Sequence, residues 1–290
     1  MADNIIITIK KCCVEISELI RTKHTGDLSS ITLDSNISGD EVKKLDILSN
    51  EILLQELLQC DDVRNVGSEE ENDLIMTNNK NAPYLVCYDP LDGSSNIDSN
   101  ITTGTIFAIY EYDNDCIANG HNIIAAGYCL YGGATQFIIA DSTGVKMYIL
   151  NNGVFDLIND NLKINPKGNV YSINESNKYN WIDNRFNLFV DDCISNNYTS
   201  RWVGSMVADA HRTIIKGGFF TYPCDTKSPD GKLRVLYEAY PFAYIFERAG
   251  GCSSDGKLES FLDLDFPTDH HQKTPLILSG THEYNVFKNL

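Results

Sequence analysis

The chain has few basic residues for its size, and this scarcity limits what it can bind. Its 290 residues include 23 Lys and Arg against 40 Asp and Glu, which gives a formal net charge of −17. Such a surface repels nucleic acid and anionic membranes, so neither is expected as a partner. An acidic protein can still bind an anion, but only through a local basic cluster or a bound cation.

Long hydrophobic runs are also missing from the sequence. No stretch approaches the roughly 20 apolar residues that a membrane-spanning helix needs. The first residues, MADNIIITIKKCC, contain a short apolar patch without a preceding basic region or a cleavage-site pattern. A signal peptide is therefore not expected.

The cysteines and histidines lack the spacings of disulfide frameworks and zinc sites. The nine cysteines are odd in number, and none forms a CxxC pair. Among the six histidines, His270 and His271 are adjacent, which favours polar surface or support of another site over a ligand set. Reduced thiols in a cytoplasmic protein fit these observations best.

Helical and strand patterns alternate in both halves of the chain, which predicts an α+β fold built in layers. Helices are expected at residues 5–21, 38–58, 183–196, 205–218 and 232–251, the last kinked or broken at Pro241. Strands are expected at residues 84–88, 103–111, 122–131, 134–140, 145–150, 169–173 and 218–222. A hairpin and linker at 152–165 indicate a subdomain boundary near residues 160–168.

Two acids, Asp89 and Asp92, follow a buried apolar run in the stretch YDPLDGSSNID. A single Asp at a strand end is most often a turn residue or a cap. Two carboxylates that a turn directs at one point are costly unless a cation neutralises them, and Mg²⁺ prefers carboxylate oxygens. The following residues 93–95, Gly-Ser-Ser, offer free N–H groups that can cradle an anion. This stretch can therefore hold a metal ion on one side and a phosphate group on the other.

Of five further acids, four have a simpler explanation than a role in a functional site. Glu69 and Glu70, taken alone, are typical of a charged surface turn. Asp40 and Asp46 lie early in a predicted helix, where caps and acids that complement the helix dipole are expected anyway. Glu238 differs, because its neighbours are nearly all apolar or aromatic, and a buried carboxylate requires a metal, a proton or a partner.

A basic cluster lies close in sequence to the last of these acids. It comprises Lys227, Lys232 and Arg234 in the segment CDTKSPDGKLR. Ordinary solvated charge is the simpler interpretation. In so acidic a chain, however, a basic cluster beside an acidic site suits a second phosphate group.

Taken together, the motifs resemble those of class I fructose-1,6-bisphosphatases. Between about residues 36 and 280 the chain reads, in order, NISGDEVKKLDILSNE, GSEE, YDPLDGSSNID, AAGYCLYGGAT, YSINES, RWVGSMVADAHR, FFTYP, KSPDGKLRVLYEAYPFAY and RAGG. DPLDGS alone is typical of the wider lithium-sensitive sugar and inositol phosphatase superfamily, whereas SMVADAHR with KLRVLYE is much more specific to this branch. The resemblance implies a layered α-β-α-β-α fold, with two mixed sheets sandwiched by helices. It also implies an N-terminal, effector-type subdomain at 1–163 that carries the acidic motifs, and a sugar-phosphate-binding subdomain at 164–290.

The resemblance implies an activity and a set of site residues. The activity is hydrolysis of the 1-phosphate of fructose 1,6-bisphosphate to fructose 6-phosphate, with two or three Mg²⁺ ions that Mn²⁺ or Zn²⁺ can replace. The implied metal ligands are Glu69, Asp89, the Leu91 carbonyl, Asp92 and Glu238. The implied catalytic acids are Asp40 on a mobile loop, Glu69, and the water-activating pair Asp46 and Glu70. The implied substrate contacts are Asp92, Gly93, Ser94, Ser95, Asn174, Arg201, Trp202, Gly204, Ser205, Met206, Tyr222, Lys232 and Arg234.

A sugar bisphosphate and further copies of the same chain are the implied partners. The resemblance favours a dimer or tetramer in which Arg201 reaches the site of a neighbouring subunit, within gluconeogenesis or sugar-phosphate metabolism. Sedoheptulose-1,7-bisphosphatase and inositol phosphate phosphatase remain as alternative activities. A pseudophosphatase that only binds sugar phosphates is the non-enzyme alternative, although the presence of every metal-ligand acid argues against it.

The sequence departs from the family where AMP binds. The Gly-Thr-Gly-Glu stretch has no counterpart, a Lys-Tyr pair appears as Pro83-Tyr84, and an Arg at a strand end appears as Glu111. A carboxylate in place of a cation disfavours a phosphate, so AMP inhibition is expected to be lost. At the substrate site, two family tyrosines correspond to Asn177 and Trp202, which removes two hydroxyl groups that contact phosphate in the family.

Overall fold

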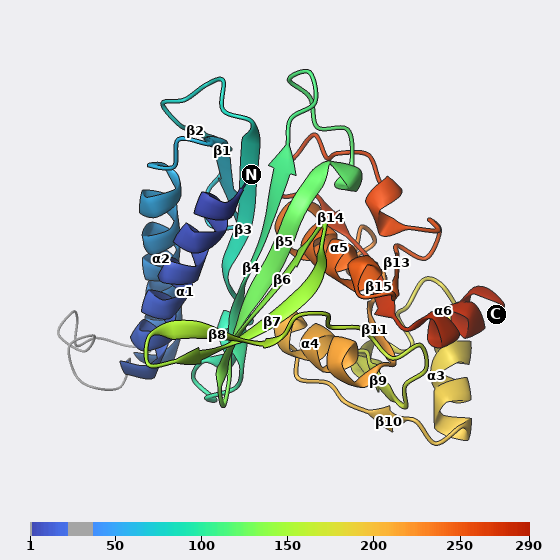
Figure 1. Cartoon of the computed structure of the whole chain (residues 1–290). Coiled ribbons are helices and arrows are strands. Elements are labelled where there is room, and N and C mark those ends of the chain that lie inside the picture. The colour runs from blue at the N-terminus through green and yellow to red at the C-terminus, as the bar shows by residue number, and fades with distance from the viewer. Residues whose placement is uncertain (1, 23–36) are drawn as a thin grey trace.

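The structure is a computed structural model that describes residues 2–22 and 37–290, except for the side chains of residues 37–43. Figure 1 shows five layers: helices α1 and α2, a large sheet, helices α4 and α5, a second sheet, and helices α3 and α6. Hydrophobic clusters of buried residues fill the spaces between the layers. The predicted layered α+β fold with two mixed sheets is confirmed.

The first layer pairs α1 (Asp3–Thr22) with α2 (Ile37–Leu57). Along α1, Ile5, Ile9 and Ile16 recur at helical spacing. All three are buried in the hydrophobic cluster between this helix layer and the large sheet. The predicted helices at 5–21 and 38–58 are therefore confirmed within one to two residues at each end.

The large sheet has eight strands in the order β2-β1-β3-β4-β5-β6-β7-β8. Their bounds are β2 Ile75–Met76, β1 Val63–Ser68, β3 Tyr84–Asp92, β4 Thr103–Glu111, β5 Ile123–Tyr131, β6 Thr135–Asp141, β7 Gly144–Asn151 and β8 Val154–Asn159. Strands β1 and β3 are parallel, and every other neighbouring pair is antiparallel. Helices cover both faces, so all nine residues of β3 are buried.

The middle layer consists of α4 (Met206–Lys216) and α5 (Tyr240–Arg248). Beyond it lies the second sheet, with β10 Thr199–Ser200, β9 Val170–Ser172, β11 Phe219–Tyr222, β15 Leu276–Ser279 and β13 Cys252–Ser254 in that order. The outer helices α3 (Arg185–Ser195) and α6 (Thr281–Lys288) complete the fold. A separate antiparallel pair joins β12 (Leu233–Arg234), which lies shortly before α5 in sequence, to β14 (Lys273–Thr274) near the C-terminal end of the chain.

Two predicted elements differ from the structure in ways that matter for the site. The strand expected at 84–88 continues to Asp92, so DPLD is part of β3 and not a turn after it. The helix expected at 232–251 is divided into β12, a π-helical turn over Val235–Ala239, and α5. Pro241 lies in the first turn of α5, where its missing N–H needs no partner. By contrast, the hairpin expected within 152–165 is confirmed, because β8 pairs antiparallel with β7.

No helix in the described ranges is both long enough and apolar enough to cross a membrane.

Candidate active site

A β-bulge at the C-terminal end of β3 directs two acids to the same side. Asp89 pairs with Ile106 of β4, but Asp92 pairs with Gly104, so three steps along β3 match two steps along β4. Pro90 lies within this bulge, where its lack of a backbone N–H removes no ladder bond, and its carbonyl accepts a hydrogen bond from the Thr105 hydroxyl at 2.8 Å. Bulges of this kind commonly redirect side chains at functional sites.

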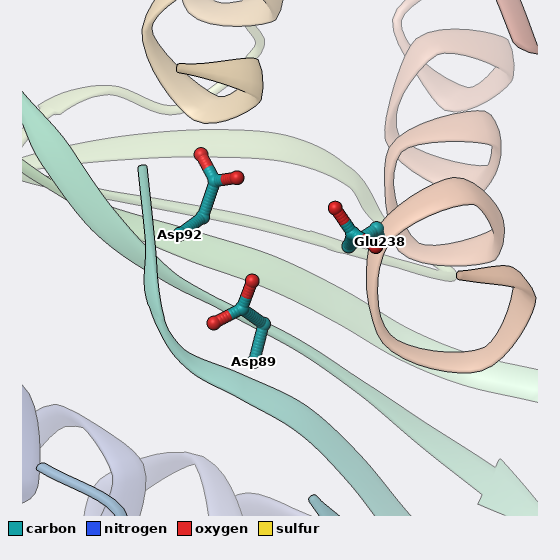
Figure 2. Close-up of side chains that lie close together, drawn as sticks. All are labelled: Asp89, Asp92 and Glu238. Carbon is teal, nitrogen blue, oxygen red and sulfur yellow. The ribbon is translucent and has the colours of Figure 1, made fainter. Parts of the chain in front are cut away.

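A third acid reaches the same point from a distant part of the chain. Glu238 lies in the π-helical turn before α5. One carboxylate oxygen from each of Asp89, Asp92 and Glu238 lies within 4.8 Å of the other two, and all three residues are buried. Figure 2 shows the three side chains directed into one space between β3 and the helical turn.

Hydrogen bonds from backbone groups hold each carboxylate in place. Asp89 Oδ1 accepts from the Leu91 N–H at 2.9 Å. Asp92 Oδ2 accepts from the Val207 N–H at 2.7 Å, in the first turn of α4, where a helix favours negative charge. Glu238 Oε2 accepts from the Arg234 N–H at 2.6 Å. The carboxylates are therefore oriented before any ligand binds.

The three carboxylates repel one another strongly in this arrangement. Burial, and then the charges of Glu69, Asp92 and Glu238, raise the pKa of Asp89 well above its usual value. Burial also raises the pKa of Asp92 to about 7, and burial followed by Glu69 raises the pKa of Glu238 well above normal. Buried carboxylates that destabilise each other in this way suit a cation, and a set of oxygen donors alone suits a hard cation such as Mg²⁺.

The structure brings the acids that looked like a surface turn to the same site. Glu69 follows β1, and its N–H donates to the Tyr88 carbonyl at 3.1 Å, immediately before Asp89. Its carboxylate lies 3.7 Å from the Arg234 guanidinium. Because β1 and β3 are parallel neighbours, their carboxyl ends meet at one edge of the sheet. The sequence could not reveal this pairing, since β1 has only six residues and was not predicted.

Asp46 of α2 faces this group of acids. Burial and then the charge of Glu70 raise the pKa of Asp46 to about 7, and a hydrogen bond with Ser94 partly opposes the rise. The charges of Asp46 and Glu70 therefore act on each other, which favours the protonated form of Asp46. Asp40 lies in the first turns of α2, but its side chain lies outside the described residues.

The segment after β3 provides backbone groups for an anion. Gly93 adopts a φ of 74°, which favours glycine, and a Cβ at this position would lie 2.5 Å from the Ser205 Oγ. The turn therefore places the short helix Ser94–Asn96 directly against the start of α4. Gly204, with a φ of 83°, ends the loop before α4, and Met206 is buried in its first turn.

The second half of the chain contributes cationic and aromatic groups that were predicted for the site. Arg234 is near Glu69, and its Nε atom is buried without a hydrogen-bond partner among the described residues. Lys232 lies 3.6 Å from the Asp225 carboxylate. The centroid of the Tyr222 ring is 5.0 Å from that of the Trp202 ring. Burial, and then the charges of Asp92, Asp209 and Glu238, raise the pKa of Tyr222.

Two predicted substrate residues have contacts away from the acid cluster. Arg201 is exposed, and its Nη1 donates to the Ser200 carbonyl at 2.9 Å. Asn174 caps a short helix by accepting from Ser176. Asn177, by contrast, contacts the same acid as Lys232, because its Nδ2 donates to the Asp225 carboxylate at 3.3 Å.

Two polar residues that hold segments of the site in place were not predicted from the sequence. Asp209 of α4 is fully buried, and its carboxylate accepts from the N–H groups of Val203 and Gly204, which fixes the loop before α4. Asn50 of α2 accepts from Ser68 and Tyr88 through one oxygen atom. The position of Asp209 in the apolar helical stretch MVADA could have indicated a buried polar residue with a structural role.

Comparisons with known proteins agree along nearly the whole chain. The family model "Fructose-1-6-bisphosphatase, N-terminal domain" matches residues 3–160, and the corresponding C-terminal domain matches residues 164–290. Fructose-1,6-bisphosphatase class 1 of Sulfurihydrogenibium sp. (strain YO3AOP1) is 42% identical over 98% of this chain and 90% of that protein. Fructose-1,6-bisphosphatase 1 of Bos taurus is 42% identical over 94% of this chain and 84% of that protein.

A plant relative and a solved structure extend this similarity. The cytosolic fructose-1,6-bisphosphatase of Oryza coarctata is 40% identical over 96% of this chain and 84% of that protein. The crystal structure of Leishmania major fructose-1,6-bisphosphatase in holo form has a TM-score of 0.88 at 33% identity. It matches 98% of this chain and 91% of the solved chain.

Proposed function

Because this chain belongs to the fructose-1,6-bisphosphatase family and is a phosphoric monoester hydrolase, we propose that it hydrolyses the 1-phosphate of fructose 1,6-bisphosphate. The products are fructose 6-phosphate and inorganic phosphate. The observation that carries the proposal is the convergence of Asp89, Asp92 and Glu238 at the end of β3, directly before the turn at residues 93–95. The reaction belongs to gluconeogenesis or sugar-phosphate metabolism, and we place the protein in the cytoplasm.

The acids would hold two or three Mg²⁺ ions. Glu69, Asp89, Asp92 and Glu238 would bind through carboxylate oxygens, and Leu91 through its carbonyl. When bound, the cations supply Lewis-acid stabilisation of the charge that develops on the phosphoryl oxygens. Mn²⁺ or Zn²⁺ would replace Mg²⁺, because carboxylates accept all three ions.

The protein's own groups would orient the phosphate and remove a proton. The N–H groups and hydroxyls of Ser94 and Ser95, with Gly93, would hold the 1-phosphate. Asp46 and Glu70 would accept the proton of the attacking water, and the raised pKa of Asp46 makes it a capable base near neutral pH. Asp40 would join these acids as a further catalytic group.

Residues from the second half of the chain would hold the sugar and its 6-phosphate. We assign residues 1–163 to the subdomain with the acidic motifs and residues 164–290 to the sugar-phosphate-binding subdomain. The residues assigned to the substrate are Asp92, Asn174, Trp202, Gly204, Ser205, Met206, Tyr222, Lys232 and Arg234. We further propose a dimer or tetramer, in which Arg201 completes the site of a neighbouring subunit; its exposed position is compatible with this role.

We expect no inhibition by AMP at micromolar concentrations. Glu111 pairs with Tyr84 across β3 and β4. Burial, and then the charges of Glu111, Asp62 and Asp3, raise the pKa of Tyr84, so acids gather where an anion would have to bind. The check is a titration of activity with AMP at saturating Mg²⁺. Inhibition by the product fructose 6-phosphate is the positive control, and micromolar inhibition by AMP would refute the prediction.

The proposed substrate is tested against its closest alternatives. Values of kcat/KM are measured at the same Mg²⁺ concentration for fructose 1,6-bisphosphate, sedoheptulose 1,7-bisphosphate and inositol monophosphate. We expect fructose 1,6-bisphosphate to be preferred by about tenfold or more, since discrimination depends on polar groups that only the correct substrate satisfies. A higher value for another substrate would replace the proposed one. Binding of sugar phosphates without phosphate release from any of them would indicate a pseudophosphatase.

A further inference from the structure

Two histidine rings share one hydrogen-bond acceptor at the edge of the site. The Nε2 atoms of His270 and His271 lie 2.8 Å and 2.9 Å from the carbonyl oxygen of Glu71. The centroids of the two rings are 3.8 Å apart, so the rings lie against each other. The histidines are separated from Glu71 by 199 and 200 positions along the chain, so this contact joins its two halves.

The shared acceptor determines where the hydrogens of the rings are. A carbonyl oxygen can only accept, so both Nε2 atoms must carry hydrogen. In neutral His271 the Nδ1 atom is then an acceptor, and the Tyr237 hydroxyl lies 2.6 Å away, where it can donate. Burial and then the charge of His270 lower the pKa of His271, which favours this neutral form. Tyr237 therefore selects the tautomer in which His271 donates to Glu71.

Glu71 directly follows two acids that the reaction needs, Glu69 and Glu70. Its carboxylate is held from the opposite side, because Asn50 Nδ2 donates to Glu71 Oε1 at 2.8 Å. The loop is thus fixed through a side chain by α2 and through a carbonyl by the histidines. Its position relative to the rest of the site depends on both contacts.

The other end of this network is also at the site. Tyr237 precedes Glu238 in the π-helical turn, an irregular element that commonly occurs at functional sites. The series Tyr237, His271, Glu71 therefore connects the turn that carries Glu238 with the loop that carries Glu69. These two acids come from different halves of the chain, and only contacts between the halves can fix their separation.

We propose that His270 and His271 are positioning residues of the phosphatase reaction, which fix the loop of Glu69 and Glu70 against Glu238. They act through the Glu71 backbone and are not themselves assigned to metal or substrate. The inference rests on the proposed function, since it concerns the metal-dependent step. If the two histidines only stabilised the contact between the two halves of the chain, their removal would lower the melting temperature but leave kcat of the folded enzyme unchanged.

The test compares removal of the imidazoles with a conservative replacement. His270→Ala with His271→Ala removes both donors, whereas His270→Gln with His271→Gln retains an Nε2 donor at each position. We expect the alanine pair to lower kcat by about tenfold to a hundredfold, as loss of residues that orient metal ligands does. The Mg²⁺ concentration for half-maximal activity should rise, and KM for fructose 1,6-bisphosphate should stay within about twofold because the substrate contacts are unchanged. The glutamine pair should recover most of kcat.

A second measurement, the melting temperature, tests the positioning role without relying on turnover. The rise in melting temperature on addition of Mg²⁺ should be smaller in the alanine pair than in the wild type. His282→Ala is the matched control, because His282 is exposed on the same half of the chain, and it should change none of these values. If the alanine pair does not fold, the single variant His270→Ala replaces it. We then expect changes of the same direction but smaller magnitude in kcat, Mg²⁺ requirement and melting temperature.

The outcomes separate this inference from the proposed function. Wild-type protein that releases no phosphate from fructose 1,6-bisphosphate would refute the proposed function. Active wild-type protein, together with an alanine pair whose kcat and Mg²⁺ requirement are unchanged, would overturn only the positioning role. A loss of kcat that glutamine does not restore would also overturn it, since the donated hydrogen bonds would then not be the cause.

Discussion

Replacing Asp92 with asparagine should nearly abolish phosphate release, with kcat lowered by about a thousandfold or more. The change removes one negative charge from the cluster of Asp89, Asp92 and Glu238 but keeps an oxygen that can accept from the Val207 N–H. The backbone around the site should therefore stay in place while the cluster loses affinity for a divalent cation. A metal ion that polarises phosphoryl oxygens contributes several kcal/mol to the transition state, and each 1.36 kcal/mol is tenfold in rate.

The same substitution should have the opposite effect on stability without metal. Asp92 is buried among like charges, so its ionised form destabilises the metal-free fold. Asp92→Asn should therefore raise the melting temperature in a chelator at pH 8. Asp160→Asn serves as the control, since it changes an exposed carboxylate just beyond β8 and should alter neither activity nor stability. If Asp92→Asn kept activity within about tenfold of wild type, the assignment of the metal site would be wrong.

Stabilisation by Mg²⁺ should increase as the pH rises from 5 to 8. In the folded, metal-free protein, burial raises the pKa of Asp92 to about 7 from its usual value of 3.8. Between these values the folded state binds more protons than the unfolded state, so stability falls as pH rises. For Asp92 alone the loss amounts to at most about 4 kcal/mol, at 1.36 kcal/mol for each pKa unit. A bound cation removes the cause of the loss.

The measurement is the melting temperature in chelator and in Mg²⁺ at several pH values. The difference between the two conditions should be small at pH 5 and reach several degrees at pH 8. Asp92→Asn should flatten the pH dependence in chelator, because the group that titrates is gone. A Mg²⁺ effect that is constant across this range, or larger at pH 5, would show that the acids do not form the cation site.

Parts of this site could be predicted because their signals are local. Asp89 and Asp92 indicate a cation site only as a pair after an apolar run, whereas Glu238 indicates a buried acid by its aromatic and apolar neighbours. Glu69 and Glu70 gave no such signal. Their role depends on β1 lying parallel to β3, which is a long-range pairing that a short strand with mixed burial does not reveal.

The shape of the backbone at the site was predicted less well than its residues. A turn was expected after residue 88, but β3 continues through a bulge that depends on its pairing with Gly104 of β4. The helix over 232–251 was correct in its second half, whereas the π-helical turn that carries Glu238 has the same apolar pattern as an α-helix. The contacts of the histidine pair could not be predicted from the sequence, because the acceptor, the Glu71 carbonyl, lies about two hundred residues away along the chain.

The central claim is that the carboxylates around Asp89 form a cation site that drives hydrolysis of a sugar bisphosphate. It is tested most directly by the Mg²⁺ dependence of phosphate release from fructose 1,6-bisphosphate. We expect no release in chelator, saturable activation by Mg²⁺, and no activation in Asp92→Asn. Release that is independent of Mg²⁺, or equal activation of the variant, would contradict it.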